Sequence, residues 1–446
     1  MRIPRHPTEM PALAAMAASL LAACFSPVTA TPGTTDGGTV ADGGTDDSGL
    51  RDAGTPVPCR MDPGGALLTN LAEANSDEDR PGPPAIAAGP DRFLVVVPRM
   101  VRSPKASSLV AALVAKDRTV EKELTLLDKL DEPIGVDVAS DGAGYLVVFG
   151  AQSRVAQGLR LSRDGSVVAG PFAITTETVS SWPVVAFGGG TYLVVYGRST
   201  STYDASLFAR RISPTGDVSE EISISEAKRN QFSPAVSYDG TSFLVVWQDE
   251  RNQAGLDENA DIYAARVSPD GTVLDPSGIA ICTAPGEQRH PHAAFDGTRN
   301  IVVWFDATEP HMWGEGNVRG ARLGTDGVLD GLPEAGGFGI NTGPGYKDHP
   351  RALRFGQGTL VAWGSTGFSG NGGAGIFGAH LGPDGTVLDD APGETGLILS
   401  GQPMWASRSL FPATATLGGQ GMMVWLDNIE LAGEAKSVFG AVLCPF

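Results

Sequence analysis

The sequence predicts an all-β fold, and three of its features lead to this prediction. A segment containing a strand similar to LVVW occurs seven times, and the strand ends at Val97, Phe149, Tyr196, Trp247, Trp304, Trp363 and Trp425. Segments similar to SPDGTVLD follow five of these strands and place Asp-Gly or Thr-Gly at a hairpin turn. The repeat has no helical periodicity. Seven units of four short antiparallel strands predict a seven-bladed β-propeller.

The composition indicates a turn-rich globular protein with an acidic surface. The 446 residues carry a formal net charge of −19, which argues against a nucleic-acid partner. Glycine and proline are frequent, at 59 and 32 residues, but 41% of the residues are hydrophobic. A chain of this composition can bury a core, so we expect a folded protein.

The N-terminus has the features of a targeting segment. Arg2 and Arg5 precede an apolar run at 11–23, which is shorter than a membrane span of ~20 residues and is typical of a signal peptide. The run ends in LAAC, which resembles the lipobox of bacterial lipoproteins. This resemblance implies removal of residues 1–23 and lipidation of Cys24. An ordinary Ala-x-Ala cleavage site beside an incidental cysteine is the alternative.

The residue after the cysteine bears on location. Phe25 stands where lipoproteins retained at the inner membrane often carry Asp, so the resemblance points to the outer membrane or the cell surface. Residues 24–58 consist mainly of Thr, Gly, Asp, Ala and Pro and contain too few large apolar residues to form a core. We expect a flexible acidic tether over 24–58 and the propeller over 59–446.

Each unit is predicted to contain two hairpins. Thirteen positions before the end of the LVVW-like strand stand Pro84, Val136, Pro183, Pro234, Pro291, Pro350 and Pro412. Because proline cannot donate to a ladder, we expect it at the first residue of strand A, which a tight turn joins to strand B. The turns of the second hairpin, between strands C and D, are Asp164-Gly165, Thr215-Gly216, Asp270-Gly271, Asp326-Gly327 and Asp384-Gly385.

The two ends of the propeller sequence are predicted to meet in one blade. The seventh unit ends at 439–446 without a fourth strand, and residues 65–74 match the fourth-strand segments of other units. An N-terminal strand therefore completes the last blade. Closure places Cys59 and Cys444 on the same blade, where they can form a disulfide in an oxidising envelope. Cys282 is left as a small buried apolar residue.

Residues 60–446, with their LVVW and SPDGTVLD repeats, resemble bacterial β-propeller proteins that occur among secreted and surface lipoproteins of Gram-negative bacteria. The resemblance implies the fold but names no chemistry. Blade 1 departs from the repeat, because Pro98 follows its LVVV strand and Asp117-Arg118 replaces Asp-Gly. We expect this blade to be irregular.

Candidate ligand-binding residues gather on one predicted face. The long loops at 248–260, 305–316 and 364–375 all join strands B and C, and the second of them contains Trp313. Loops on a rigid ring are the expected place for a ligand-binding site. The alternative is that these loops are only solvated insertions. The tight Asp-Gly turns form the opposite face.

The residues before four of the strand-opening prolines belong to the same face, near the mouth of the central channel. They are Trp182, His290, His349 and Phe411. Together with Trp313 they form the predicted ligand-binding set, and Glu287, Arg289, Lys347 and Asp348 lie nearby in sequence. In a ligand site of this kind, histidine would titrate between about pH 5.5 and 7.5. The alternative is that these residues, extended as residues before proline usually are, only pack between blades.

Metal and catalytic motifs are incomplete. Asp257, Asn259 and Asp261 have the D-x-N-x-D spacing of a calcium loop, but Ile262 and Ser268 replace its Gly and bidentate Glu. The sequence contains no H-E-x-x-H and no complete G-x-S-x-G. We therefore assign no catalytic residue, no metal and no cofactor apart from this calcium candidate.

The prediction that follows is a monomeric, surface-anchored binding propeller of the bacterial envelope. A glycan or a peptide is the favoured ligand, because the predicted rim combines aromatic and polar side chains. Two alternatives stay open, since fold does not decide function. One is a secreted hydrolase or lyase on the same scaffold, and the other is a structural spacer.

Overall fold

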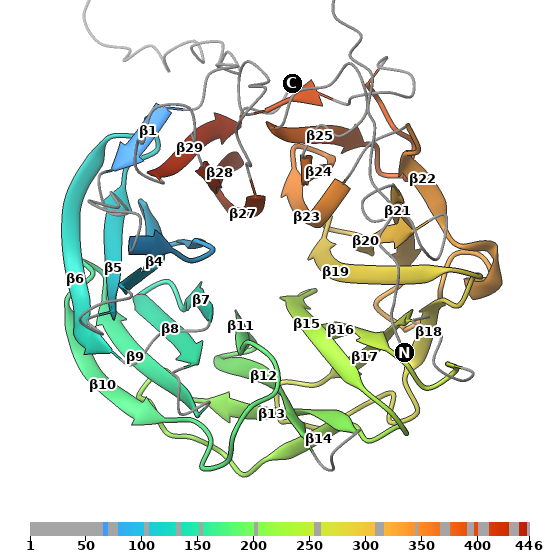
Figure 1. The fold of residues 1–446 in the computed structure, drawn as a ribbon, viewed down its shortest axis with the longest axis horizontal. Helices are drawn as coiled ribbons and strands as arrows, with labels where there is room; N and C mark the ends of the chain where they lie inside the picture. Colours follow the sequence, from blue (N-terminus) through green and yellow to red (C-terminus); the bar gives the residue numbers. More distant parts are fainter. Residues whose placement is uncertain are drawn as a thin grey trace, which may run out of the picture. The chain divides into compact units, whose positions relative to one another are not determined.

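The computed structural model contains seven antiparallel sheets arranged as the blades of a ring (Figure 1). All described residues belong to one compact unit, Pro58–Phe446. The structure describes residues 66–69, 79–101, 107–130, 135–150, 155–199, 204–253, 260–307, 316–343, 347–365, 375–389, 397–399, 410–427 and 437–443. The predicted all-β, seven-bladed propeller is confirmed.

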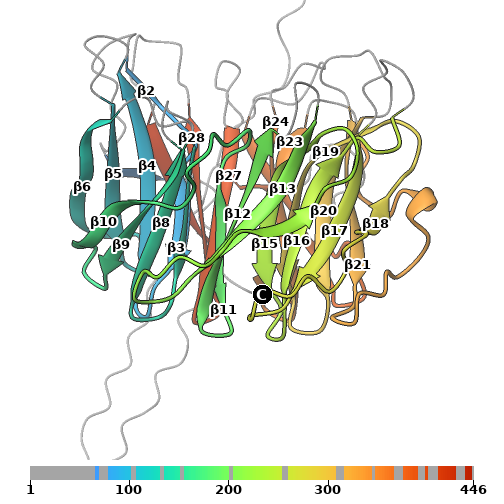
Figure 2. The same ribbon diagram turned by 90° about the horizontal axis from the view of Figure 1, so that it is seen from below.

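The strands run between the two faces of the ring, as its side view shows (Figure 2). Blade 1 contains β2 (Asp79–Pro81), β3 (Ala85–Ala88), β4 (Phe93–Val101), β5 (Ser107–Val114) and β6 (Val120–Leu130). Blade 2 contains β7 (Gly135–Ser140), β8 (Gly144–Gly150), β9 (Ala156–Ser162) and β10 (Val167–Ala173). Blade 3 contains β11 (Val184–Gly188), β12 (Thr191–Ser199), β13 (Ala205–Ile212) and β14 (Ile222–Ser225).

The remaining blades repeat the same order from the centre outward. Blade 4 contains β15 (Gln231–Tyr238), β16 (Phe243–Asp249), β17 (Asp261–Val267) and β18 (Ile279–Cys282). Blade 5 contains β19 (Glu287–Phe295), β20 (Asn300–Ala307), β21 (Gly316–Leu323), the short 3-10 helix η2 (Pro333–Ala335) and β22 (Phe338–Asn341). Blade 6 contains β23 (Lys347–Phe355), β24 (Gly358–Ser365), β25 (Gly375–Leu381) and β26 (Leu397–Ile398).

Blade 7 is completed by the first strand of the chain. Its sheet order is β1-β29-β28-β27, where β1 is Ala66–Thr69, β27 is Leu410–Leu417, β28 is Gln420–Asp427 and β29 is Ser437–Leu443. Ala66 pairs with Gly440 in antiparallel register. The predicted ring closure is thereby confirmed. Cys59 and Cys444, the predicted disulfide partners, lie outside the described residues, as does Cys24.

The hydrophobic core lies between the blades and is built mainly on the second strand of each. All seven residues of β16 are buried, because this central strand has sheets packed against both of its faces. Trp247, Trp304, Trp363 and Trp425 end the equivalent apolar runs and are at most 1% exposed. These tryptophans therefore pack in the core, as their equivalent positions at the end of the repeated strand suggest. Cys282 is also buried and unpaired, and burial raises its pKa to about 11.

Blade 1 is irregular, as its sequence predicts. Two separate strands, β2 and β3, pair with the same strand β4, so its innermost strand is interrupted. The break falls at Gly82, Pro83 and Pro84, and consecutive prolines leave two ladder donors missing. Within the described residues, no helix is long and apolar enough to cross a membrane.

The turn aspartates stabilise the hairpins between strands C and D. Asp270 Oδ1 accepts from the Thr272 main-chain N–H at 3.1 Å, and Asp384 Oδ1 accepts from that of Thr386 at 2.9 Å. Asp164 makes the equivalent contact with Ser166. These carboxylates act as acceptors inside their own turns, as expected for Asp in this position.

Candidate functional site

A β-bulge interrupts the innermost strand in blades 4, 5, 6 and 7. In blade 5, Arg289 pairs with Phe305 and His292 with Val303, so His290 and Pro291 together lie opposite one residue of β20. Equivalent register shifts occur at Ser233-Pro234, His349-Pro350 and Phe411-Pro412. The prediction that these prolines open their strands is therefore wrong in four blades. A bulge is the other position in a sheet where a missing N–H is tolerated.

The residue before each bulged proline has a left-handed backbone. The φ values are 50° at Ser233, 51° at His290, 47° at His349 and 58° at Phe411. Residues before proline normally favour extended conformations, and positive φ is uncommon outside glycine. The extended conformation expected from sequence is thus wrong at these four positions. Bulges redirect side chains, and strained residues of this kind concentrate at functional sites.

These side chains converge on one cavity at the centre of the ring. It has a volume of about 470 Å³, and Trp182, His290, His349 and Phe411 all line it. The cavity lies where the innermost strands begin, which is the end opposite the A–B turns. Four of the five residues predicted to bind a ligand are therefore brought together. Trp313 lies outside the described residues.

Two histidines share one carboxylate behind the cavity wall. Asp348, 9% exposed, places Oδ1 at 2.6 Å from His290 Nδ1 and at 2.9 Å from His349 Nδ1. The two imidazole rings stack with centroids 3.9 Å apart and planes 15° apart. Phe411 meets His349 edge-on at 4.3 Å. Because Nδ1 of each ring faces Asp348, Nε2 is the ring nitrogen left for a ligand.

Burial sets the charges of this cluster. Burial lowers the pKa of His349 to about 4, although Asp348 acts in the opposite direction. His349 is therefore neutral at pH 7, which corrects the pH range of 5.5–7.5 expected for its titration. Burial also disfavours ionisation of Asp348, but hydrogen bonds from His290 and His349 outweigh it and hold the pKa of this carboxyl well below its usual range.

His290, Asp348 and His349 are also a group of residue types that bind metals, with ligand atoms within 4.8 Å of one another. Their arrangement does not fit a shared ion. Both Nδ1 atoms lie against Asp348 Oδ1, at 2.6 and 2.9 Å, so this oxygen occupies the position that an ion shared by the two histidines would need. The His290 ring is hydrogen-bonded to Asp348, and the His349 ring lies within ion-pair distance of the same oxygen.

A second layer of polar residues lines the cavity, and two of its three members directly follow a bulge. Asp137, His292 and Arg351 come directly after Val136, Pro291 and Pro350, at a repeat position where the other blades have Ala or Val. All three line the cavity. They were missed in the sequence, although one signal marks them: they are the polar members of a register position that otherwise carries Ala or Val.

The second-layer residues have defined hydrogen bonds. His292 Nδ1 accepts from the Ala352 main-chain N–H at 3.2 Å. Asp137 accepts from the main-chain N–H groups of Val138 and Val185, at 2.9 and 2.8 Å. Burial raises the pKa of Asp137 to about 6, and burial lowers that of His292 well below its usual value.

Other charged residues near the predicted rim do not line the cavity. Lys347 is buried and donates to the Gly316 main-chain oxygen at 2.8 Å. Arg289 pairs with Glu287 on the same strand. None of Glu287, Arg289, Lys347 and Asp348 is among the residues that line the cavity, and Asp348 contacts the imidazoles described above.

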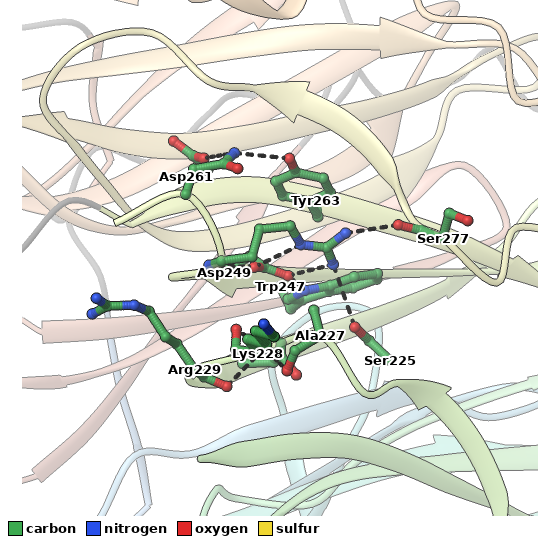
Figure 3. A network of polar contacts seen from close by, with 12 residues as sticks. Ser225, Ala227, Lys228, Arg229, Trp247, Asp249, Asp261, Tyr263 and Ser277 are labelled. Carbon is green, nitrogen blue, oxygen red and sulfur yellow. Dashed lines mark hydrogen bonds and ion pairs between the residues drawn. The ribbon is translucent and has the colours of Figure 1, made fainter. Parts of the chain in front are cut away.

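The start of the long blade 4 loop has a structural network (Figure 3). Asp249 is fully buried and accepts from Trp247 Nε1 at 2.7 Å and from Arg251 Nη2 at 2.6 Å. The guanidinium of Arg251 stacks on Tyr263 and donates to the Ser277 main-chain oxygen. These contacts stabilise the base of the loop and leave no carboxylate oxygen of Asp249 directed at a ligand.

The calcium candidate is described in part. Asp257 and Asn259 lie outside the described residues. Asp261 Oδ2 accepts from Asn252 Nδ2 at 2.7 Å, and burial raises the pKa of this carboxyl.

Comparisons with known proteins concern the fold alone. The sequence matches no protein-family model and no curated protein. The β-propeller domain of the Trilobed protease from Pyrococcus furiosus is 10% identical, with a TM-score of 0.46 and coverage of 82% of this chain and 94% of that one. Acylaminoacyl peptidase from Pyrococcus horikoshii is 11% identical, with a TM-score of 0.46 and coverage of 85% and 53%.

A viral structure shows a similar level of likeness. The subtype N11 neuraminidase-like protein of A/flat-faced bat/Peru (H18N11) is 10% identical, with a TM-score of 0.44 and coverage of 86% of this chain and 94% of that one. At such identities no activity transfers from these proteins, because one fold carries many functions.

Proposed function

We propose that this protein is a binding propeller whose ligand occupies the central cavity, with a glycan favoured over a peptide. The observation that supports this most is the set of four bulges with positive φ, all four of which place a polar or aromatic residue in the lining of one cavity. Backbone strain of about 1–3 kcal/mol per residue persists only where the surrounding structure maintains it. Packing between blades does not by itself explain why this strained backbone conformation occurs in four blades.

The aromatic rim favours a carbohydrate. Trp182 is 46% exposed and lines the cavity, and a Cβ at Gly135 would lie 2.5 Å from its Cγ, so the indole packs closely on blade 2. An exposed indole fixed in this way offers a flat apolar surface to the C–H groups of a sugar ring. The histidine Nε2 atoms add acceptors for hydroxyl groups.

For location, we propose a lipid anchor at Cys24 that holds the propeller at the outer membrane or the cell surface. The LAAC sequence after the apolar run supports this proposal. A membrane-anchored binding protein needs reach, which the acidic segment 24–58 would provide.

Binding is tested with glycan and peptide arrays probed by the purified protein. We expect Trp182→Ala to weaken binding of any glycan found by about tenfold, because stacking and shape are lost. The matched control is Asp270→Asn, which changes a hairpin turn on the opposite face. Equal binding by Trp182→Ala and wild type, or a loss confined to Asp270→Asn, would contradict the proposed site.

A hydrolase is the second candidate function, favoured by the contact between His290 and Asp348. A carboxylate that holds Nδ1 leaves Nε2 to act as a general base. Ser233 occupies the same bulge position in the preceding blade and also lines the cavity, so its hydroxyl is the candidate nucleophile. Among the described contacts no hydrogen bond joins Ser233 to His290, and we therefore place binding first.

A fluorophosphonate that modifies activated serines separates the two functions. Labelling of the wild type that disappears in Ser233→Ala would favour the hydrolase. Glycan binding without labelling would favour the binding protein. A protein that shows neither property would leave the third possibility, a structural spacer.

A further inference from the structure

We propose that Arg351 and His292 form a carboxylate-binding site at the floor of the cavity, and that the ligand is a sugar acid such as a uronic acid. This inference rests on the proposed function and names the ligand class of the same cavity. It begins with Arg351, which lies on β23 and lines the cavity.

The guanidinium of Arg351 has donors to spare. Its described hydrogen bond runs from Nη1 to the main-chain oxygen of Pro350, at 3.2 Å. A guanidinium carries five N–H donors and stays charged. A half-buried cation is costly unless it is paired, and partial loss of solvent accordingly lowers the pKa of Arg351. An anion that enters the cavity would supply the missing acceptors.

His292 adds a neutral donor beside this cation. Its Nδ1 accepts from the main-chain N–H of Ala352, so Nδ1 carries no proton. Because burial keeps His292 uncharged at pH 7, its proton must reside on Nε2. Ala352 follows Arg351 on β23, which places the imidazole next to the arginine. The floor therefore combines a charged fork with one neutral N–H.

Asp137 offsets the positive charge of Arg351 without a described ion pair between the two. Both of its oxygens accept main-chain N–H groups, and the described ion pairs include none between Asp137 and Arg351. Arg351 nevertheless favours the charged form of Asp137 through the electric field. Arg351 lines the cavity, and its one described hydrogen bond leaves donors for a ligand. Arg–carboxylate pairs are among the strong hydrogen-bonded contacts in proteins.

The other residues of the cavity lining favour a sugar acid over a peptide C-terminus. The rings of His290 and His349 stack with centroids 3.9 Å apart, so they place two ring nitrogens side by side, which can hydrogen-bond neighbouring hydroxyl groups on a sugar ring. N–H groups on one side of an extended peptide recur only about every 6.6 Å. Trp182 and Phe411 complete the wall with apolar surface for the sugar ring.

The proposal is tested by calorimetric titration of the full chain with glucuronic and galacturonic acids. Glucose and galactose serve as the matched neutral ligands. We expect the acids to bind at least about tenfold more tightly, since a charge-assisted contact is lost in the neutral sugars. Equal affinity for acids and neutral sugars, or no binding of the acids, would overturn the proposal.

Variants locate the carboxylate contact. Arg351→Gln should remove the preference for the acids, and Arg351→Lys should keep part of it, because Lys retains the charge but not the fork. Arg354→Gln is the control, since Arg354 is an exposed arginine on the same strand. An unchanged preference in a folded Arg351→Gln variant would contradict the assignment. If that variant does not fold, the ligand series on the wild type still decides.

A tripeptide with a free or an amidated C-terminus provides the last comparison. Binding of the free form alone, with no binding of the acids, would assign the site to peptides and overturn the sugar acid. Neutral sugars that bind as tightly as the acids and depend on Trp182 would remove the carboxylate site but keep the proposed function. Loss of all saccharide and peptide binding would remove both.

Discussion

Arg266 in blade 4 donates from Nη1 to the main-chain oxygen of Thr325, 2.9 Å away in the C–D hairpin of blade 5. The same contact joins Arg160 to Thr215 at 2.8 Å and Arg322 to Asp384 at 3.1 Å. A third-strand arginine thus binds the hairpin turn of the next blade. These contacts link successive blades at their C–D turns.

Arg266→Ala should destabilise the propeller by about 2 kcal/mol, because it removes a charged hydrogen bond and leaves Asp275 without its partner. Asp275 accepts from Arg266 Nε at 2.8 Å and from Nη2 at 2.9 Å. Urea unfolding measures the loss. Arg160→Ala is the control, since it removes the same contact between blades without a described carboxylate partner. A loss as large in the control would show that Asp275 contributes little.

Acid should destabilise the protein through His349. Its folded-state pKa of about 4 lies below the ordinary value of 6.5, so the unfolded chain binds a proton that the folded chain does not. Stability should therefore fall as the pH drops from about 6.5 to about 4, by roughly 1.4 kcal/mol per pKa unit. Thermal unfolding of wild type and His349→Gln measures this, and identical pH slopes would contradict it.

Affinity for a sugar acid should rise as the pH falls from 7.5 to 5. Asp137, whose pKa is about 6, loses its negative charge over this range, while the ligand carboxylate stays ionised. Protonated Asp137 then no longer offsets the positive charge of Arg351, so Arg351 attracts the ligand carboxylate more strongly. Asp137→Asn should bind more tightly at pH 7.5 and show a flatter profile. A wild-type affinity that decreases on acidification would oppose this.

The two cysteines at the ends of the propeller sequence should form a disulfide. Strands β1 and β29 pair in the same blade, and in the sequence Cys59 precedes β1 by seven residues while Cys444 directly follows β29. Peptide mapping without reduction should detect the cross-linked peptides. Cys282 is the internal control, because its buried thiol should react with an alkylating reagent only after denaturation. Recovery of Cys59 and Cys444 as free thiols would disprove the pairing.

Lipidation of Cys24 should be visible in detergent phase partitioning after expression in a bacterial host. The wild type should enter the detergent phase, and Cys24→Ala should stay in the aqueous phase, since acyl chains supply the membrane affinity. Cys59→Ala is a control that keeps the LAAC segment. Aqueous partitioning of the wild type would favour the alternative of an ordinary cleavage site.

The fold was predictable because each repeat contains the sequence pattern of one four-stranded blade. Each LVVW-like strand, each Asp-Gly turn and the missing fourth strand of the last unit carry information that is local in sequence. The bulges were not predictable in the same way. A proline at the first residue of a strand and a proline in a bulge satisfy the same hydrogen-bond rule, so the sequence alone does not choose between them.

The sequence predicted the residues at the mouth of the cavity but missed the polar residues deeper in it. Trp182, His290, His349 and Phe411 were found because they precede the repeated prolines. Arg351 and His292 were missed because their direction depends on the bulge beside them. Each bulge lies opposite Trp247, Trp304, Trp363 or Trp425, so a tryptophan at this repeat position marks the blades that contain one.

During synthesis, β1 leaves the ribosome before any other described strand and β29 leaves it last. The two can pair only when the whole propeller sequence has been made, so blade 7 is the last to be completed. At roughly 5–20 residues per second, this wait is on the order of tens of seconds. Without β1, β29 would present an open strand edge, the kind of edge that pairs with other chains. The short strand Ala66–Thr69 covers this edge.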